Sequence, residues 1–129
     1  MTQWVNIAFM TITEGKTLLH NPRCSKSRLA LQMLEESGVE FTVREYLADP
    51  LSRDELSELQ ALLGMAPLEW TRTGEAEWAE TGLSSSASQD ELLDALASWP
   101  KLLQRPILIS GGVARVGRPP EALRELLEA

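Results

Sequence analysis

A single cysteine, placed where a predicted strand passes into a predicted helix, constrains the fold of this chain more than any other feature. Residues 17–19 form a short apolar run typical of a strand that enters a core, and Pro22 follows, which cannot continue it because proline lacks a backbone N–H. Residues 25–37 have helical composition and spacing. Cys24, the only cysteine in the sequence, is therefore predicted to lie at the N-terminus of a helix.

This position favours reactive chemistry at Cys24. The free N–H groups and partial positive charge of a helix N-terminus stabilise a thiolate, and they can also bind a tetrahedral oxyanion beside the sulfur. Arg23, Lys26 and Arg28 add positive charge nearby, and His20 is close enough in sequence to contribute. Arg28 faces the same side of the helix as Cys24, so it is a candidate to bind an anion or to pair with a carboxylate. The alternative is that Cys24 is a small buried apolar residue.

The composition indicates one globular domain in the reducing cytoplasm. A chain of 129 residues is long enough for one core, and its net charge of −7 argues against a nucleic-acid surface, which is usually basic. One cysteine and no secretory leader favour the cytoplasm, and the single histidine lacks partners for a metal site. The sequence has nine arginines and only three lysines, and arginine is the better residue for bidentate binding of oxyanions.

Residues 1–16 are interpreted as an N-terminal extension of uncertain order. The segment 4–10 is apolar, but it is too short to span a bilayer and no basic residue precedes it, so no membrane association is expected. Three interpretations stay open: an edge strand, a tail, or a sequence upstream of a natural start at Met10.

Residues 17–46 predict a βαβ unit. After the helix at 25–37, Gly38 supplies a stop, and residues 41–46 alternate with the period of a strand. Strand, helix and strand in this order normally give two parallel strands joined by a right-handed crossover.

A helical insertion is predicted at about 50–100. Residues 52–55 and 88–91 are capping boxes, and each precedes a stripe of leucines at helical spacing. The segment between them predicts short helical pieces in which Trp70 and Trp78 contribute to packing.

The C-terminal part predicts a hairpin and a final helix. Residues 106–109 and 113–116 have strand character and are joined by two glycines, which suit a hairpin turn. A helix follows the prolines of 117–120. The order βαβ–helical insertion–ββα predicts an α/β, thioredoxin-like fold in a single domain spanning 17–129.

Three segments carry a family likeness: HNPRCSKSR at 20–28, LQRPILI at 103–109 and ARVGRPP at 114–120. In this order and at this spacing they resemble the motifs of the glutaredoxin-linked arsenate reductases, the ArsC-like family. The likeness runs from about Thr17 to the C-terminus. It implies a thioredoxin-like fold, in which the bond between Arg105 and Pro106 is expected to be cis.

The resemblance implies an enzyme in which the Cys24 thiolate attacks arsenate. Three arginines hold the oxyanion in that family, and by motif position they are Arg72, Arg105 and Arg118. The surroundings of Arg72 depart from the leucine- and lysine-containing stretch usual in the family. His20 matches a family histidine that supports the thiolate.

The same resemblance implies the reductants. Because the chain has no second cysteine, an external thiol must complete the reaction, which points to glutathione and glutaredoxin, with no bound cofactor and no metal. The physiological setting would be arsenic detoxification. Arg23 stands where some members have a small residue, and Ser25-Lys26 replaces a glycine-containing pair, so the specificity can differ from arsenate.

Two other functions stay open at this point. The same fold includes Spx-like regulators that bind RNA polymerase, but these typically carry a Cys-x-x-Cys switch, and here the fourth position of that motif is Ser27. The other is a thiol oxidoreductase or thiol-binding protein of the same fold that does not reduce arsenate.

Overall fold

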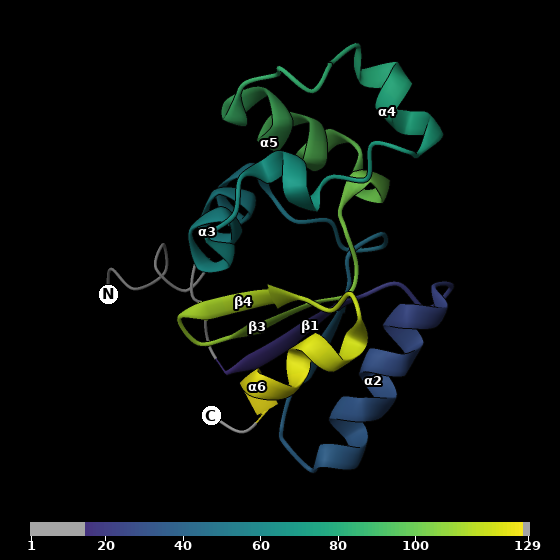
Figure 1. Cartoon of the computed structure of the whole chain (residues 1–129), viewed down its shortest axis with the longest axis vertical. Helices are drawn as coiled ribbons and strands as arrows, with labels where there is room; N and C mark the ends of the chain where they lie inside the picture. The colour runs from purple at the N-terminus through teal and green to yellow at the C-terminus, as the bar shows by residue number, and fades with distance from the viewer. Residues whose placement is uncertain (1–14, 128–129) are drawn as a thin grey trace.

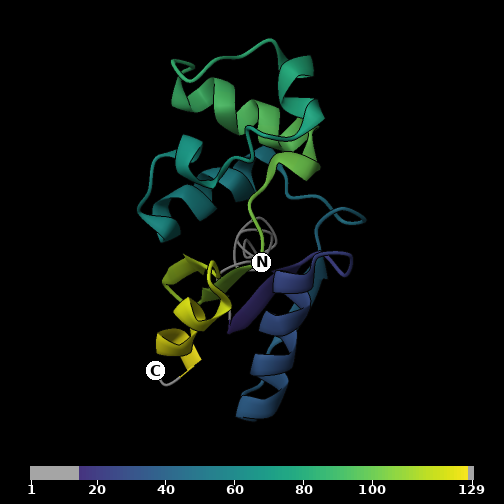
Figure 2. The ribbon, with the colours of Figure 1, turned by 45° about the vertical axis from the view of Figure 1, so that its right-hand side comes forward.

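A computed structural model describes residues 15–127 of the chain, and Figures 1 and 2 show them as a four-stranded sheet with helices on both faces. The strand order is β2-β1-β3-β4. Most of the predicted N-terminal extension, including Met10, lies outside the described residues, whereas Lys16 opens the first strand.

The predicted βαβ unit is confirmed. Strand β1 (Lys16–His20) leads through the Cys24 turn into α2 (Ser25–Ser37), and β2 (Thr42–Glu45) returns parallel to β1. Helix α2 ends at Gly38, whose φ of 78° is the left-handed conformation that glycine adopts at little cost.

The helical insertion is also confirmed, and its two long helices begin at the predicted capping boxes. Ser52 accepts a hydrogen bond from the backbone N–H of Glu55 ahead of α3, and Ser88 accepts one from Glu91 ahead of α5. The elements of the insertion, in order, are α3 (Arg53–Leu63), η1 (Pro67–Trp70), α4 (Ala76–Thr81), α5 (Gln89–Ser98) and η2 (Pro100–Leu102).

The chain then returns to the sheet. Strands β3 (Ile107–Ser110) and β4 (Val113–Val116) form the predicted antiparallel hairpin, and β3 also pairs antiparallel with β1. The predicted last helix is divided into a 3-10 turn, η3 (Pro120–Leu123), and a single α-helical turn, α6 (Arg124–Leu127).

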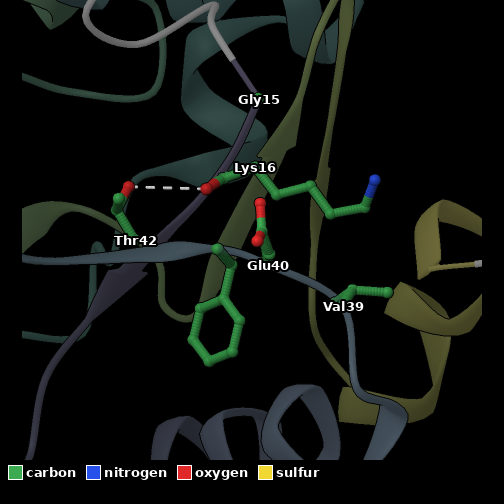
Figure 3. Close-up of a pocket in the computed structure, with 6 residues that line it drawn as sticks. Gly15, Lys16, Val39, Glu40 and Thr42 are labelled. Atoms are coloured by element: carbon green, nitrogen blue, oxygen red, sulfur yellow. Dashed lines mark hydrogen bonds between the residues drawn. The ribbon is translucent and has the colours of Figure 1, made fainter.

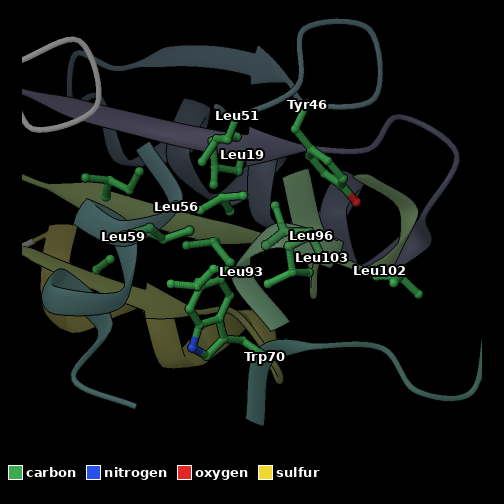
Figure 4. Close-up of a cluster of buried hydrophobic side chains, with 13 residues drawn as sticks. Leu19, Tyr46, Leu51, Leu56, Leu59, Trp70, Leu93, Leu96, Leu102 and Leu103 are labelled. Atoms are coloured by element: carbon green, nitrogen blue, oxygen red, sulfur yellow. The ribbon is translucent and has the colours of Figure 1, made fainter. Parts of the chain in front are cut away.

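Alternating side chains on the strands build a core on each face of the sheet. Leu19 and Ile107 point toward the insertion and pack with its helices, in the cluster that Figure 4 shows around Trp70. Their neighbours Leu18 and Leu108 point to the other face, where α2, η3 and α6 cover them. The insertion and the α2 side therefore share one sheet but bury separate sets of side chains.

Gly117 allows the chain to leave β4 close to its neighbours. A Cβ placed on Gly117 would lie 2.9 Å from the Leu123 side chain and 2.9 Å from the Pro106 ring. The backbone N–H of Gly117 also donates a 2.8 Å hydrogen bond to the carbonyl of Pro106. This close approach fixes the position of the residue that follows, Arg118.

Gly117→Ala is expected to lower the free energy of unfolding by about 1–2 kcal/mol, because the added methyl group must displace packed side chains. Urea denaturation measures this change. Gly112→Ala is the control, since a Cβ at Gly112 meets no atom of the described chain within 4 Å. Equal losses in the two variants would contradict the steric explanation.

Candidate active site

The register of the sheet brings four chain segments to one end. Strand β1 ends at His20, which pairs with Glu45 at the end of β2. Strand β3 begins at Ile107, which pairs with Leu19 of β1 and with Val116 at the end of β4. The cysteine loop, the residue after β2, the residues before β3 and the turn after β4 therefore meet at the same sheet end (Figure 1).

Backbone and side-chain hydrogen bonds hold the cysteine loop in shape. Cys24 is half-buried and is the N-cap residue of α2, and its N–H donates to the carbonyl of Asn21 at 3.0 Å. Arg23 donates its N–H to the Asn21 side chain at 3.0 Å. The guanidinium of Arg28 donates to the carbonyl of Pro22 at 2.9 Å, so it braces the loop. The first turn of α2 has no acidic residue, which leaves the positive end of the helix without a local counter-charge.

His20 is buried and held by Ser27. Only 4% of His20 is exposed, and its Nδ1 lies 2.7 Å from the hydroxyl of Ser27, which also accepts the N–H of Asn21 at 3.0 Å. Burial lowers the pKa of His20, the Glu45 carboxylate opposes this shift, and Arg28 adds to it. His20 therefore favours its neutral form, and Ser27 couples it to the backbone of the cysteine loop.

The pKa of His20 gives a pH dependence of stability. As the pH falls below about 6.5, an unfolded chain takes up a proton at this histidine that the folded chain resists, so the unfolded state binds more protons. The contribution of His20 is fully present above about pH 6.5 and is lost as the pH falls toward its lower folded pKa. When the pH is lowered from about 7.5 to about 5, the free energy of unfolding should fall less in His20→Asn than in the wild type, and urea denaturation at the two pH values measures this. Equal losses would contradict the shift.

Arg105 is half-buried and has donors without a partner. Its Nε and Nη1 atoms are buried, and within the described chain neither has a hydrogen-bond partner. Its backbone carbonyl accepts a 3.2 Å hydrogen bond from Nη1 of Arg118. The bond from Arg105 to Pro106 is cis, as predicted, and the bond from Arg118 to Pro119 is also cis, which the sequence analysis did not predict.

The insertion delivers Arg72 to this end through a short backbone ladder. Thr71 forms a bridge with Leu103, the N–H of Arg72 donates to Leu102 at 2.6 Å, and the N–H of Gln104 donates to Trp70 at 3.0 Å. Trp70, fully buried, packs in the core as predicted.

Arg72 and Arg118 line the same hollow, which has a volume of about 360 Å³. The remaining wall is formed by Gln104 and by residues 71–75, and it includes the carboxylate of Glu75, whose Oε2 lies 2.5 Å from Nη1 of Arg72. Cys24 and Arg105 are not among the lining residues. They lie at the same sheet end, with Arg105 joined to Arg118 by the hydrogen bond to its carbonyl.

Tyr46, predicted only as part of a strand, is a buried residue at this end of the sheet. It is 1% exposed and follows directly after β2. Burial raises the pKa of Tyr46, and the positive charge of Arg72 opposes the shift. The signal in the sequence that could have indicated this place is that Tyr46 comes at the end of a predicted strand of the βαβ unit.

Other candidate residues lie outside this hollow. Arg23 and Lys26 are exposed beside Cys24.

A second hollow, of about 560 Å³, lies at the opposite end of the sheet around the start of β1 (Figure 3). It is lined by Gly15, Lys16 and residues 39–42, and it shares no residue with the site.

Within 15–127, no group of three or more histidine, cysteine, aspartate or glutamate side chains is arranged to hold a metal ion. No helix in this part of the chain is both long enough and apolar enough to cross a membrane.

Known proteins share this sequence and structure over most of their length. The profile of the ArsC family matches residues 19–126. The chain is 45% identical over 112 residues to a Streptomyces viridochromogenes protein described as uncharacterized, in a glnII region, covering 83% of this chain and 94% of the relative. It is 42% identical to the arsenate reductase of Neisseria meningitidis, covering 85% of this chain and 96% of the relative. A structure of the arsenate reductase from Vibrio cholerae matches with a TM-score of 0.82 at 40% identity, covering 87% of this chain and 97% of that chain.

The architecture and the site define a class of protein: a thioredoxin-like fold with a helical insertion and one cysteine at the N-terminus of the first helix of its βαβ unit. One arginine of the insertion and the arginines that flank the two ends of the β3–β4 hairpin lie at the same end of the sheet. With a family profile that matches most of its length, the chain belongs to the ArsC family.

Proposed function

We propose that this protein is an arsenate reductase in which the thiolate of Cys24 attacks arsenate and Arg72, Arg105 and Arg118 hold the oxyanion. The observation that carries the proposal is the guanidinium of Arg105. Two of its nitrogens are buried and lack a partner in the described chain, and buried N–H donors without an acceptor cost free energy. A bound oxyanion supplies acceptors and a negative charge. Relatives named arsenate reductase at 42% and 40% identity support arsenate as the substrate.

Each residue then has a distinct role. Cys24, at the N-terminus of α2, attacks arsenate and forms an S–As bond as one arsenate oxygen leaves as water. Arg105 and Arg118 offset the negative charge of the adduct from the hairpin side, and Arg72 does so from the insertion. His20 stays neutral and holds the loop through Ser27, and Arg28 braces the loop at Pro22 and adds positive charge.

The electrons come from outside the chain. Reduction of arsenate to arsenite takes two electrons, and two thiols supply them by forming one disulfide and giving up two protons. Cys24 has no second cysteine to pair with. We therefore propose that glutathione and glutaredoxin complete the reaction, which takes place in the cytoplasm and needs no bound cofactor.

The test is arsenate-dependent oxidation of NADPH, coupled through glutathione reductase, glutathione and glutaredoxin. Turnover that saturates with arsenate and requires glutaredoxin is the expected result. Absence of turnover, combined with protection of Cys24 from alkylation by arsenate, would leave an anion and thiol site without reductase activity. Absence of both would remove the proposal.

A further inference from the structure

The hollow that contains Arg72 and Arg118 has a carboxylate in its wall, which a simple anion site does not need. Glu75 is 27% exposed at its side chain and lies 2.5 Å from Arg72, whose side chain is 24% exposed. It lines the same hollow as Arg118. Negative charge at this place weakens binding of any anion that presents only unprotonated oxygens.

Gln104 also lines this hollow, and its side chain carries an acceptor without a partner. Its Oε1 is buried and has no hydrogen-bond partner in the part of the chain that the structure describes. Its backbone is fixed, because its N–H donates to Trp70 at 3.0 Å, so the side chain projects from the ladder that also carries Arg72. A buried acceptor without a donor costs free energy until a ligand brings a hydrogen.

Donors and acceptors together define the ligand. Guanidinium groups bind oxygens without protons, whereas a carboxylate and an amide oxygen require an O–H group on the ligand. At neutral pH, arsenate and phosphate keep at least one proton, and sulfate keeps none. A wall that holds both kinds of partner therefore distinguishes tetrahedral oxyanions by protonation.

We propose that Glu75, assisted by Gln104, is a specificity-determining residue that selects an oxyanion carrying a proton and rejects sulfate. This inference rests on the proposed function, because it assigns the hollow beside Arg72 and Arg118 to the oxyanion. Glu75 takes no part in electron transfer. Its carboxylate accepts the O–H of the bound oxyanion while Arg72 keeps further N–H groups for an unprotonated oxygen.

The experiment measures how well arsenate, phosphate and sulfate each protect Cys24 from alkylation by iodoacetamide, with the modified protein quantified by mass spectrometry. In the wild type, phosphate and arsenate should halve the alkylation rate at concentrations at least about tenfold lower than sulfate. In Glu75→Gln, the sulfate concentration that halves the alkylation rate should fall about tenfold, because the repulsive charge is gone. Phosphate should change little, since the glutamine oxygen still accepts a hydrogen bond.

Glu77→Gln is the matched control. Glu77 is a partly buried carboxylate two positions further on, paired with Lys101 at 3.5 Å and absent from the lining of the hollow. The substitution removes the same charge from the first turn of α4, which Glu75 caps, and should leave the relative protection by the three anions unchanged.

The outcomes separate the inference from the proposed function. Equal protection by sulfate and phosphate in the wild type would overturn the inference and leave the arsenate site in place. An equal loss of protection by all three anions in Glu75→Gln would also overturn the inference, because Glu75 would then act only by positioning Arg72. Selective protection without arsenate turnover would support the selectivity and remove the reductase assignment. No protection by any of the three would overturn both.

Discussion

Cys24→Ser is expected to abolish arsenate-dependent turnover and to leave the fold intact. The serine hydroxyl ionises far less readily than a thiol and forms no S–As bond, so the first covalent step is lost. The half-buried side chain is similar in size, and the hydrogen bonds of Cys24 to Asn21 and Arg28 use backbone atoms only. The coupled NADPH assay measures the activity, and urea denaturation measures the stability.

Two results would contradict this expectation. Turnover in Cys24→Ser at the wild-type rate would mean that the sulfur takes no part in the chemistry. Loss of activity together with a large loss of stability would mean that Cys24 supports the fold. Alkylation of the wild-type thiol provides an independent check, because it should abolish turnover without any substitution.

Arg105→Lys should lower the catalytic efficiency by about a hundredfold, which corresponds to about 2.7 kcal/mol of transition-state stabilisation. The Nε and Nη1 donors of Arg105 are both buried and without a partner in the described chain, so they can donate to a bound ligand. A lysine keeps the charge, but its compact ammonium cannot place donors at the positions that the planar guanidinium covers.

Arg124→Lys is the control for this prediction, because Arg124 is exposed on α6 and its replacement should have almost no effect. A small loss in Arg105→Lys, similar to that of the control, would show that the buried donors do not contact the transition state. The same pair of variants in the alkylation experiment separates weaker oxyanion binding from a slower chemical step.

Much of the fold could be predicted because its signals are local. The serines at the N-termini of α3 and α5 make the expected capping boxes, and Gly38 ends α2 in the left-handed conformation. The period of two in β1 and β3 separates Leu18 from Leu19 and thereby builds two cores. Each of these features depends on residues within a few positions of one another, where propensity and spacing are informative.

The site was predictable only where one segment carries its own chemistry. Cys24 at a helix N-terminus and the two arginines ahead of prolines can be read from short motifs, and their catalytic roles stay predictions. The positions of Tyr46, Glu75 and the Ser27 hydroxyl depend on which strand ends meet and on how the insertion returns to the sheet. No local pattern records such a meeting of distant segments.

The backbone ladder between the insertion and the residues ahead of β3 makes the position of Arg72 independent of the residue types beside it. The hydrogen bonds that place it join main-chain groups, from Arg72 to Leu102 and from Gln104 to Trp70. Main-chain groups are common to almost every residue type, so these hydrogen bonds hold the backbone of Arg72 in place whatever side chains flank it. Side-chain substitutions in this stretch are therefore expected to alter the wall of the hollow without moving the main chain at Arg72.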